Sequence, residues 1–157
     1  MRILFVCHGN ICRSPMAESI MKDLVSRKGV SDDFYIESCA TSTEELGNDI
    51  YPPAKRCLQA HGVPFERRRA RQMTAADYQR FDMIIAMDSN NLYNMRRFVN
   101  GDPEKKVSLM MSHCGKDRDV ADPWYTGDFE RTFDDITEAC EALLESITAR
   151  RGRSCSR

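Results

Sequence analysis

The fold class is decided by residues 3–14, which read Ile3-Leu4-Phe5-Val6-Cys7-His8-Gly9-Asn10-Ile11-Cys12-Arg13-Ser14. The first four residues are apolar and β-prone, which predicts a strand covered on both faces, as in a parallel sheet. After the turn at Gly9-Asn10, apolar side chains recur at helical spacing until Gly29; they are Ala17, Ile20, Met21, Leu24 and Val25. This part of the chain therefore predicts a strand, a tight loop and a helix, in that order.

The rest of the chain continues the alternation of strands and helices. Further strands are expected at Phe34–Ser38, Asp82–Met87 and Val107–Met111. Helices are expected from Pro52-Pro53 to just before Gly62, through Leu92, Met95 and Phe98, and along the apolar stripe Phe133, Ile136, Cys140, Leu143, Leu144 and Ile147. Such alternation predicts a doubly wound α/β fold, in which ligands bind at the carboxyl ends of the strands. Cys7 stands at such an end.

Length and composition favour one globular domain. The chain has 157 residues, of which 30% are charged and 41% are hydrophobic, and its formal net charge is -1. This length is close to that of one domain, so we expect a single domain over residues 1–149 and a disordered tail over residues 150–157. The nearly balanced charge gives no bulk attraction for nucleic acid. The oligomeric state, a monomer or a weak dimer, stays open.

The chain carries no pattern of export, membrane insertion or disulfide bonding. The apolar start Ile3–Val6 is much shorter than a signal-peptide core and ends in a polar turn. Seven cysteines at irregular spacing favour free thiols over a disulfide framework. We therefore expect a cytoplasmic protein with no membrane partner.

The loop between Cys7 and Arg13 combines a nucleophile with features that bind phosphate. Backbone amides at the start of a helix, together with the helix dipole, attract anions, and Gly9 and Asn10 tolerate the left-handed backbone that such a loop needs. Arg13 adds a planar fork that matches two phosphate oxygens. The same surroundings would favour the thiolate form of Cys7, which is the attacking form. Ser14 is placed to donate a hydrogen bond to the sulfur.

A reaction at this loop also needs a general acid, because an alkoxide or phenoxide leaves poorly without a proton. The candidate is Asp122, which precedes Pro123 in a stiffened loop. Trp124 and Tyr125 follow, and their rings could form the walls of a slot for a flat substrate. In a second half-reaction the ionised carboxylate would take a proton from water. The predicted reaction is therefore hydrolysis of a phosphate monoester through a phosphocysteine.

These motifs match a known family. The run Cys7-His8-Gly9-Asn10-Ile11-Cys12-Arg13-Ser14-Pro15, with the distant Asp122-Pro123-Trp124-Tyr125, closely resembles the low-molecular-weight protein tyrosine phosphatases. The resemblance spans nearly the whole chain and includes Ala40-Thr41-Ser42, Ala70-Arg71-Gln72, Ala86-Met87-Asp88 and Gly127-Asp128-Phe129. It implies a three-layer α/β sandwich with a four-stranded parallel sheet, helices on both faces and the phosphate loop after the first strand. It also implies that the protein removes phosphate from phosphotyrosine in other proteins, by hydrolysis and without a cofactor.

The resemblance assigns roles to individual residues. It implies Cys7 as the nucleophile, Arg13 as the phosphate ligand and Asp122 as acid and then base. The phosphate-binding residues would be His8, Gly9, Asn10, Ile11, Cys12, Arg13 and Ser14. A polar scaffold of Asn10, Ser14, Ser38 and Asp88 would fix the loop.

Two features near the expected site depart from the common pattern of the family, and Ile11 bears on the choice of substrate. His8 stands where the family commonly has an aliphatic residue, and a cationic imidazole there could change the pH profile. The loop near Glu44 and Glu45 lacks the aromatic residue often found there, so Trp124 and Tyr125 would have to supply the substrate walls. Ile11 is apolar, whereas related arginine phosphatases look as though they have Thr at this position. The apolar side chain favours phosphotyrosine as the substrate.

Several alternatives stay open at this point. Cys12 either packs under the loop or captures oxidised Cys7 as a reversible disulfide. Arsenate reductases have a related fold, but their extra redox cysteines would fall within 81–97, which has none. A thiol redox sensor or an anion-binding protein would not need Asp122. No metal site is expected, because the chain has no Cys-x-x-Cys pair and no spaced His pair.

Overall fold

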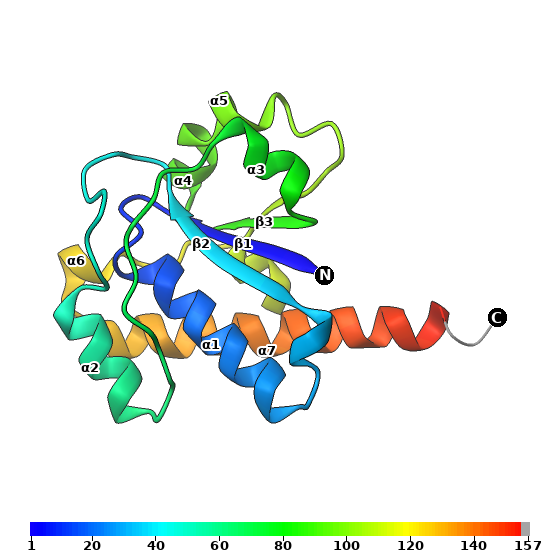
Figure 1. Ribbon diagram of the computed structural model, residues 1–157, viewed down its shortest axis with the longest axis horizontal. Coiled ribbons are helices and arrows are strands. Elements are labelled where there is room, and N and C mark those ends of the chain that lie inside the picture. Colours follow the sequence, from blue (N-terminus) through cyan, green and yellow to red (C-terminus); the bar gives the residue numbers. More distant parts are fainter. Residues whose placement is uncertain (155–157) are drawn as a thin grey trace.

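A computed structural model describes residues 1–154, and within them four strands form one parallel sheet. The strands are β1 (Arg2–Cys7), β2 (Tyr35–Ala40), β3 (Met83–Ala86) and β4 (Val107–Leu109). They lie in the order β2-β1-β3-β4, and each neighbouring pair is parallel; Figure 1 labels the first three of them. The expected four-stranded parallel sheet is therefore confirmed.

β1 lies inside the sheet because its side chains are apolar on both faces. Ile3 and Phe5 pack into the core on one face, whereas Leu4 and Val6 pack into the core on the other, and all four are fully buried. This is the period-two alternation of a strand buried on both sides. Cys7 ends the strand opposite Ala40 of β2, at the carboxyl edge of the sheet, where ligands bind in folds of this class.

Helices cover both faces of the sheet and complete three layers (Figure 1). On one side are α1 (Arg13–Arg27), α2 (Pro52–Ala60) and α7 (Phe129–Ser154), and on the other are α3 (Ala75–Arg80), α4 (Ser89–Asn94) and α5 (Arg96–Val99). The remaining short elements are η1 (Ser31–Asp33), η2 (Met110–Cys114) and α6 (Pro123–Thr126). None of the helices in residues 1–154 has the combination of length and apolar character needed to span a bilayer.

Three details differ from the sequence-based expectation. The helix expected through Leu92 and Phe98 is interrupted at Met95, which ends α4 and precedes α5. The fourth strand stops at Leu109, because a 3₁₀ turn begins at the next residue. Helix α3 was not expected, although it begins with a capping box in which the Thr74 and Asp77 side chains bond each other's backbone amides. That box has a sequence signature, Thr-x-x-Asp, and could have been read in advance.

Helix α7 continues beyond the boundary expected for the tail. The sequence predicted a disordered segment from Arg150, but the helix runs to Ser154. Arg151 in its last turn lies 3.3 Å from Asp33 Oδ2 and stacks over the Phe34 ring, with its guanidinium carbon 5.4 Å from the ring centroid. Basic residues also stabilise the carboxyl end of a helix through its dipole. The rest of the expected tail, residues 155–157, lies outside the described residues.

The segment between η2 and α6 is fastened to α7 by a two-pronged ion pair. Arg118 Nη1 and Nη2 each donate at 2.8 Å to the carboxylate of Asp135, which is 7% exposed. These hydrogen bonds hold the pKa of Asp135 below its ordinary value of 3.8. Because Arg118 shortly precedes Asp122, the pair sets the path of the loop that carries the expected general acid.

We predict that Asp135→Asn lowers the free energy of unfolding at pH 7 by about 1–2 kcal/mol, since it removes a charge-assisted pair that is partly open to solvent. A lowered carboxyl pKa stabilises the folded state above the ordinary value of 3.8, and this contribution is lost as the pH falls through the lowered value. The gap between wild type and variant should therefore be constant from pH 7 to about 5 and should shrink below about pH 4. Urea unfolding over this pH range measures it.

Glu138→Gln is the matched control on the same helix. Glu138 pairs with Lys116 at 2.8 Å, but both side chains are well exposed, at 48% and 40%, so its loss should cost no more than about 0.5 kcal/mol. Equal destabilisation by the two substitutions would contradict the anchoring role of Asp135, as would a gap that stays the same at pH 3.

Candidate functional site

β1 delivers Cys7 to the edge of the sheet, and the following loop turns into the first turn of α1. Asn10 has a left-handed backbone, with φ of 59°, and its side chain is fully buried. Gly9 was expected to share this conformation, but its φ is not positive. A Cβ at Gly9 would instead lie 3.3 Å from Glu45 Cγ. A left-handed backbone at Gly9 was therefore a wrong expectation. Asn10 makes the left-handed turn, and Gly9 leaves room for the side chain of Glu45.

The sulfur of Cys7 receives two contacts from its own loop and helix. The Asn10 backbone amide donates to Sγ at 3.3 Å, and Ser14 Oγ lies 3.0 Å from Sγ. Asn10 Nδ2 donates to Ser14 Oγ at 2.8 Å, and the single hydroxyl proton of Ser14 has two acceptors within reach, the Cys7 sulfur at 3.0 Å and the Cys39 carbonyl at 3.4 Å. These two contacts and the positive end of the α1 dipole surround the sulfur with polar groups.

A buried hydrogen-bond network supports the loop from behind. Asn10 Nδ2 also donates to Ser38 Oγ at 2.9 Å, and Ser38 Oγ donates to Glu18 Oε1 at 2.7 Å. The backbone amide of Arg71 donates to Asn10 Oδ1 at 3.3 Å. The structure thus brings together three of the four expected scaffold residues, Asn10, Ser14 and Ser38. Sequence reasoning missed Glu18, although it stands one helical turn after Ser14 and therefore on the same face of α1.

Asp88, the fourth expected scaffold residue, binds the guanidinium of Arg13. Arg13 is 2% exposed, and its Nη1 donates to Asp88 Oδ2 at 2.7 Å and to the Val120 carbonyl at 2.9 Å. Its Nη2 donates to Asp122 Oδ2 at 3.3 Å. Burial alone would lower the pKa of Arg13, but the charges of Cys7, Asp122 and Asp88 outweigh it and raise the pKa. Arg13 is therefore a fixed cation beside the sulfur.

Asp122 is held where a short helix begins. It is the N-cap of α6, and its Oδ1 accepts a hydrogen bond from the Trp124 amide at 3.0 Å. Its other oxygen faces Arg13, and the side chain remains 26% exposed. Asp122, from a loop far along the chain, therefore lies in the same cluster as Cys7 and Arg13.

These groups surround a pocket of about 130 Å³. Its lining residues are Cys7, His8, Gly9, Ile11, Cys12, Arg13, Glu44, Glu45, Asp122, Trp124 and Tyr125. Asn10 and Ser14 were expected to bind phosphate, but both are fully buried and do not line the pocket. Their side chains bind the loop and the sulfur from behind, and a part for their backbone amides in phosphate binding stays a prediction.

The walls of the pocket differ from one another in character. Trp124 lies on Tyr51, with ring centroids 4.9 Å apart, whereas Tyr125 is 84% exposed. Another part of the lining is polar, because His8 Nε2 forms a hydrogen bond with Glu44 Oε2 at 2.9 Å. No local pattern indicates Tyr51, because its contact with Trp124 joins distant parts of the chain. Both expected aromatic walls are thus present, and the acidic side occupies the place of the missing aromatic residue.

Cys12 lies beside the pocket as a neutral thiol. It precedes the first residue of α1 and is 5% exposed. Burial, followed by the charges of Cys7 and Asp122, raises the pKa of Cys12 well above its ordinary value, although Arg13 acts in the opposite direction. A thiol held in its protonated form is a weak nucleophile. Cys12 is therefore poorly suited to compete with Cys7 for a substrate.

Comparison with known proteins identifies the relatives of this arrangement. The family model described as low molecular weight phosphotyrosine protein phosphatase matches residues 2–153. The low molecular weight phosphotyrosine protein phosphatase of Rattus norvegicus is 39% identical over 148 residues, which are 91% of this chain and 93% of the relative.

Two solved structures have the same fold. The crystal structure of YfkJ from Bacillus subtilis is 36% identical, with a TM-score of 0.91 over 96% of both chains. That of a Drosophila arginine phosphatase is 32% identical, with a TM-score of 0.86 over 94% of this chain and 98% of the other. Because the match covers both the loop at Cys7 and the segment around Asp122, the chain belongs to the low-molecular-weight phosphotyrosine protein phosphatase family.

Proposed function

We propose that this protein hydrolyses phosphotyrosine in proteins, and small aryl phosphates, through a phosphocysteine intermediate on Cys7. The observation that carries the proposal is the meeting of three groups at one pocket of about 130 Å³: the Cys7 sulfur, the buried guanidinium of Arg13 and the Asp122 carboxylate. A nucleophile, a phosphate ligand and a proton donor are the parts that metal-free phosphoryl transfer needs.

In the first half-reaction, the Cys7 thiolate attacks phosphorus and the bond to the tyrosine oxygen breaks. Phosphate oxygens replace Asp122 on Arg13 Nη2, while Nη1 stays bound to Asp88 and the Val120 carbonyl. Asp122, released from Arg13 and carrying a proton taken up from solvent, gives that proton to the leaving phenoxide. The guanidinium of Arg13 stabilises the transition state most strongly here, because the site is buried and negative charge develops on the phosphate oxygens that it faces.

In the second half-reaction, water attacks the phosphocysteine and the sulfur leaves as a thiolate. Asp122, now ionised, takes the proton of that water, and inorganic phosphate is released. The Asn10 amide and the Ser14 hydroxyl stabilise the departing sulfur through the contacts at 3.3 and 3.0 Å. The same two donors therefore assist both attack and departure.

The pocket walls favour an aromatic substrate. Trp124 and Tyr125 offer flat apolar faces beside the loop, and such rings prefer to stack on another ring. Ile11 is 9% exposed and lines the pocket, where it adds an apolar contact. Related arginine phosphatases look as though they have Thr at this position. We therefore place phosphotyrosine ahead of phosphoarginine as the substrate.

The expected setting of the reaction is cytoplasmic. The cysteines within residues 1–154 are all free thiols, as is usual in a reducing compartment. Tyrosine-phosphorylated proteins are the proposed partners, and the chemistry uses neither a metal ion nor an organic cofactor. The monomer and the weak dimer are both compatible with a pocket built from one chain.

The first prediction concerns the three reacting groups. With p-nitrophenyl phosphate and EDTA present, Cys7→Ser should have no measurable turnover, because it lacks the thiolate. Asp122→Ala should lose about 10²–10⁴-fold in kcat, the usual contribution of a general acid, and should still bind the substrate. Steady-state kinetics at pH 5–8 and vanadate competition measure these effects.

Two variants serve as controls for this experiment. Cys114→Ser and Asp117→Ala change a thiol and a carboxylate that do not line the pocket, and both should keep wild-type kinetics. Normal turnover by Cys7→Ser or Asp122→Ala contradicts the proposal. Faster hydrolysis of phosphoarginine than of phosphotyrosine peptides would overturn the choice of substrate alone.

The second prediction tests the support behind the loop. Ser38→Ala removes the bridge between Asn10 and Glu18 without touching the pocket. The loss of an orienting hydrogen bond worth roughly 1 kcal/mol should lower kcat by about 3- to 10-fold with little change in KM. Ser112→Ala, at an exposed hydroxyl far along the chain, is the control. An unchanged kcat in a folded Ser38→Ala protein would show that the network does not position the nucleophile.

The third prediction concerns protection from oxidation. We propose that peroxide converts Cys7 to a sulfenic acid, which condenses with the Cys12 thiol to a disulfide and water. After peroxide treatment, wild type should regain activity when a thiol reductant is added, whereas Cys12→Ser should proceed to irreversible oxidation. Cys114→Ser should behave as wild type. Equal recovery of Cys12→Ser would reject the redox role of Cys12 and leave only a packing role.

A further inference from the structure

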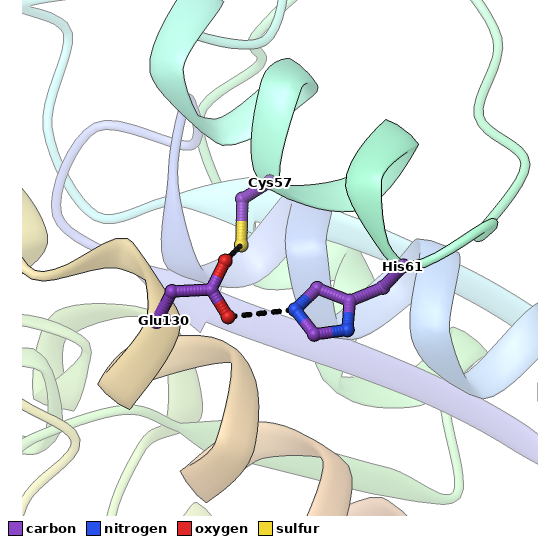
Figure 2. A group of neighbouring side chains, drawn as sticks. All are labelled: Cys57, His61 and Glu130. Atoms are coloured by element: carbon purple, nitrogen blue, oxygen red, sulfur yellow. Dashed lines mark hydrogen bonds and ion pairs between the residues drawn. The ribbon is translucent and has the colours of Figure 1, made fainter.

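Three side chains with metal-binding atoms meet at the contact between α2 and the start of α7 (Figure 2). His61 Nε2 lies 2.7 Å from Glu130 Oε2, and Cys57 Sγ lies 3.5 Å from Glu130 Oε1. The sulfur, the ring nitrogen and the carboxylate oxygen all lie within 4.8 Å of one another. None of the three residues lines the phosphate pocket, so the cluster is separate from the proposed active site.

The backbone brings these atoms together before any ligand is present. Cys57 and His61 are four residues apart, and the His61 amide still donates to the Cys57 carbonyl, so both side chains leave α2 on the same face. The His61 ring stacks on Phe133, with centroids 3.9 Å apart and an interplanar angle of 11°. This stacking, against the helix that carries Glu130, keeps Nε2 directed at the carboxylate.

The combination of ligands and its spacing fit a tetrahedral metal ion of intermediate softness. Zn²⁺ binds Cys sulfur at about 2.3 Å and His nitrogen or carboxylate oxygen at about 2.0–2.2 Å. A tetrahedron with such bonds separates neighbouring ligand atoms by roughly 3.3–3.7 Å. In this protein the ligand atoms are separated by 2.7 Å, between His61 Nε2 and Glu130 Oε2, up to at most 4.8 Å. Side-chain movements of about 1 Å would therefore bring them to tetrahedral spacing without a backbone rearrangement.

Access and burial also fit a bound ion. Cys57 is 6% exposed, whereas the side chains of His61 and Glu130 are 35% and 62% exposed. The sulfur thus forms the closed floor of the cluster, and the other two ligands reach it from the solvent side. An ion could enter without local unfolding, and a water molecule could complete its coordination.

We propose that Cys57, His61 and Glu130 bind one Zn²⁺ ion, with water as the fourth ligand, and so connect α2 to α7. On binding, the thiol of Cys57 gives its proton to solvent and its sulfur bonds to zinc. Neutral His61 binds through Nε2, and Glu130 exchanges its two hydrogen bonds for a metal bond. No electron is transferred. Because α7 begins directly after the α6 segment that holds Asp122, the ion would stabilise the base of that segment.

Cobalt is the most direct probe of this site. Co²⁺ replaces Zn²⁺ in tetrahedral sites, and a cobalt–thiolate bond gives a charge-transfer band in the near ultraviolet. The titration should be done on the Cys7→Ser protein, which removes the sulfur that lines the phosphate pocket as a competing ligand. We expect a band that saturates at one Co²⁺ per chain and disappears when Zn²⁺ is added. Cys7→Ser/Cys57→Ser should lose the band, and Cys7→Ser/Cys114→Ser should keep it.

A second measurement covers the case in which Cys57→Ser does not fold. Glu130 is exposed, so Cys7→Ser/Glu130→Gln should fold normally, yet its Zn²⁺ affinity by calorimetry should fall more than about tenfold, since even outer-shell changes often cost that much. Zn²⁺ should also raise the thermal unfolding midpoint of Cys7→Ser but not that of Cys7→Ser/Glu130→Gln. The absence of a cobalt band, a band that survives Cys57→Ser, or equal zinc affinity with Glu130→Gln would each overturn the site. Phosphatase assays in EDTA are unaffected by these outcomes.

Discussion

The structure around the site depends on one buried cation. The guanidinium of Arg13 is almost fully enclosed, and a charge in that position is tolerated only when its hydrogen bonds are satisfied by paired groups. Asp88, the Val120 carbonyl and Asp122 supply those partners from two loops distant in sequence. The contacts of Arg13 therefore hold the edge of the sheet, the start of α4 and the segment before α7 together, and the pocket forms between them.

The phosphate loop is stabilised in a different way on each side. Toward the pocket, it presents the Cys7 sulfur and the cationic fork, which are left for a substrate. Away from the pocket, the fully buried Asn10 satisfies its amide through Ser14, Ser38 and the Arg71 backbone. A left-handed residue can persist when its surroundings over-determine it, and this network does so. The loop is thereby preorganised, which is the condition for charge stabilisation without reorganisation during the reaction.

Much of the fold could be predicted from local patterns. The apolar run Ile3–Val6 predicted a strand buried on both faces, and the stripe along Phe133–Ile147 predicted a long helix, because both signals depend only on periodicity. The break at Met95 and the continuation of α7 past Arg150 could not be predicted in this way. The first occurs at a fully buried methionine, and the second brings Arg151 to Asp33 and Phe34 at the opposite end of the chain. Both depend on contacts that sequence spacing does not encode.

The family and the available chemical groups could be identified from residue order alone: a cysteine at a strand end, an arginine at the start of a helix and a distant Asp-Pro. Those groups are identified by residue type and local order, which the printed chain contains in full. The partners of these groups depend on the folded arrangement. Folding pairs Asp88 with Arg13, adds Glu18 and Arg71 behind the loop, brings Glu44 and Glu45 to the lining of the pocket, and brings Cys57 and His61 to Glu130. The physical reason is that hydrogen bonds and ion pairs act over a few ångströms in space, and folding brings within that range residues that lie far apart along the chain.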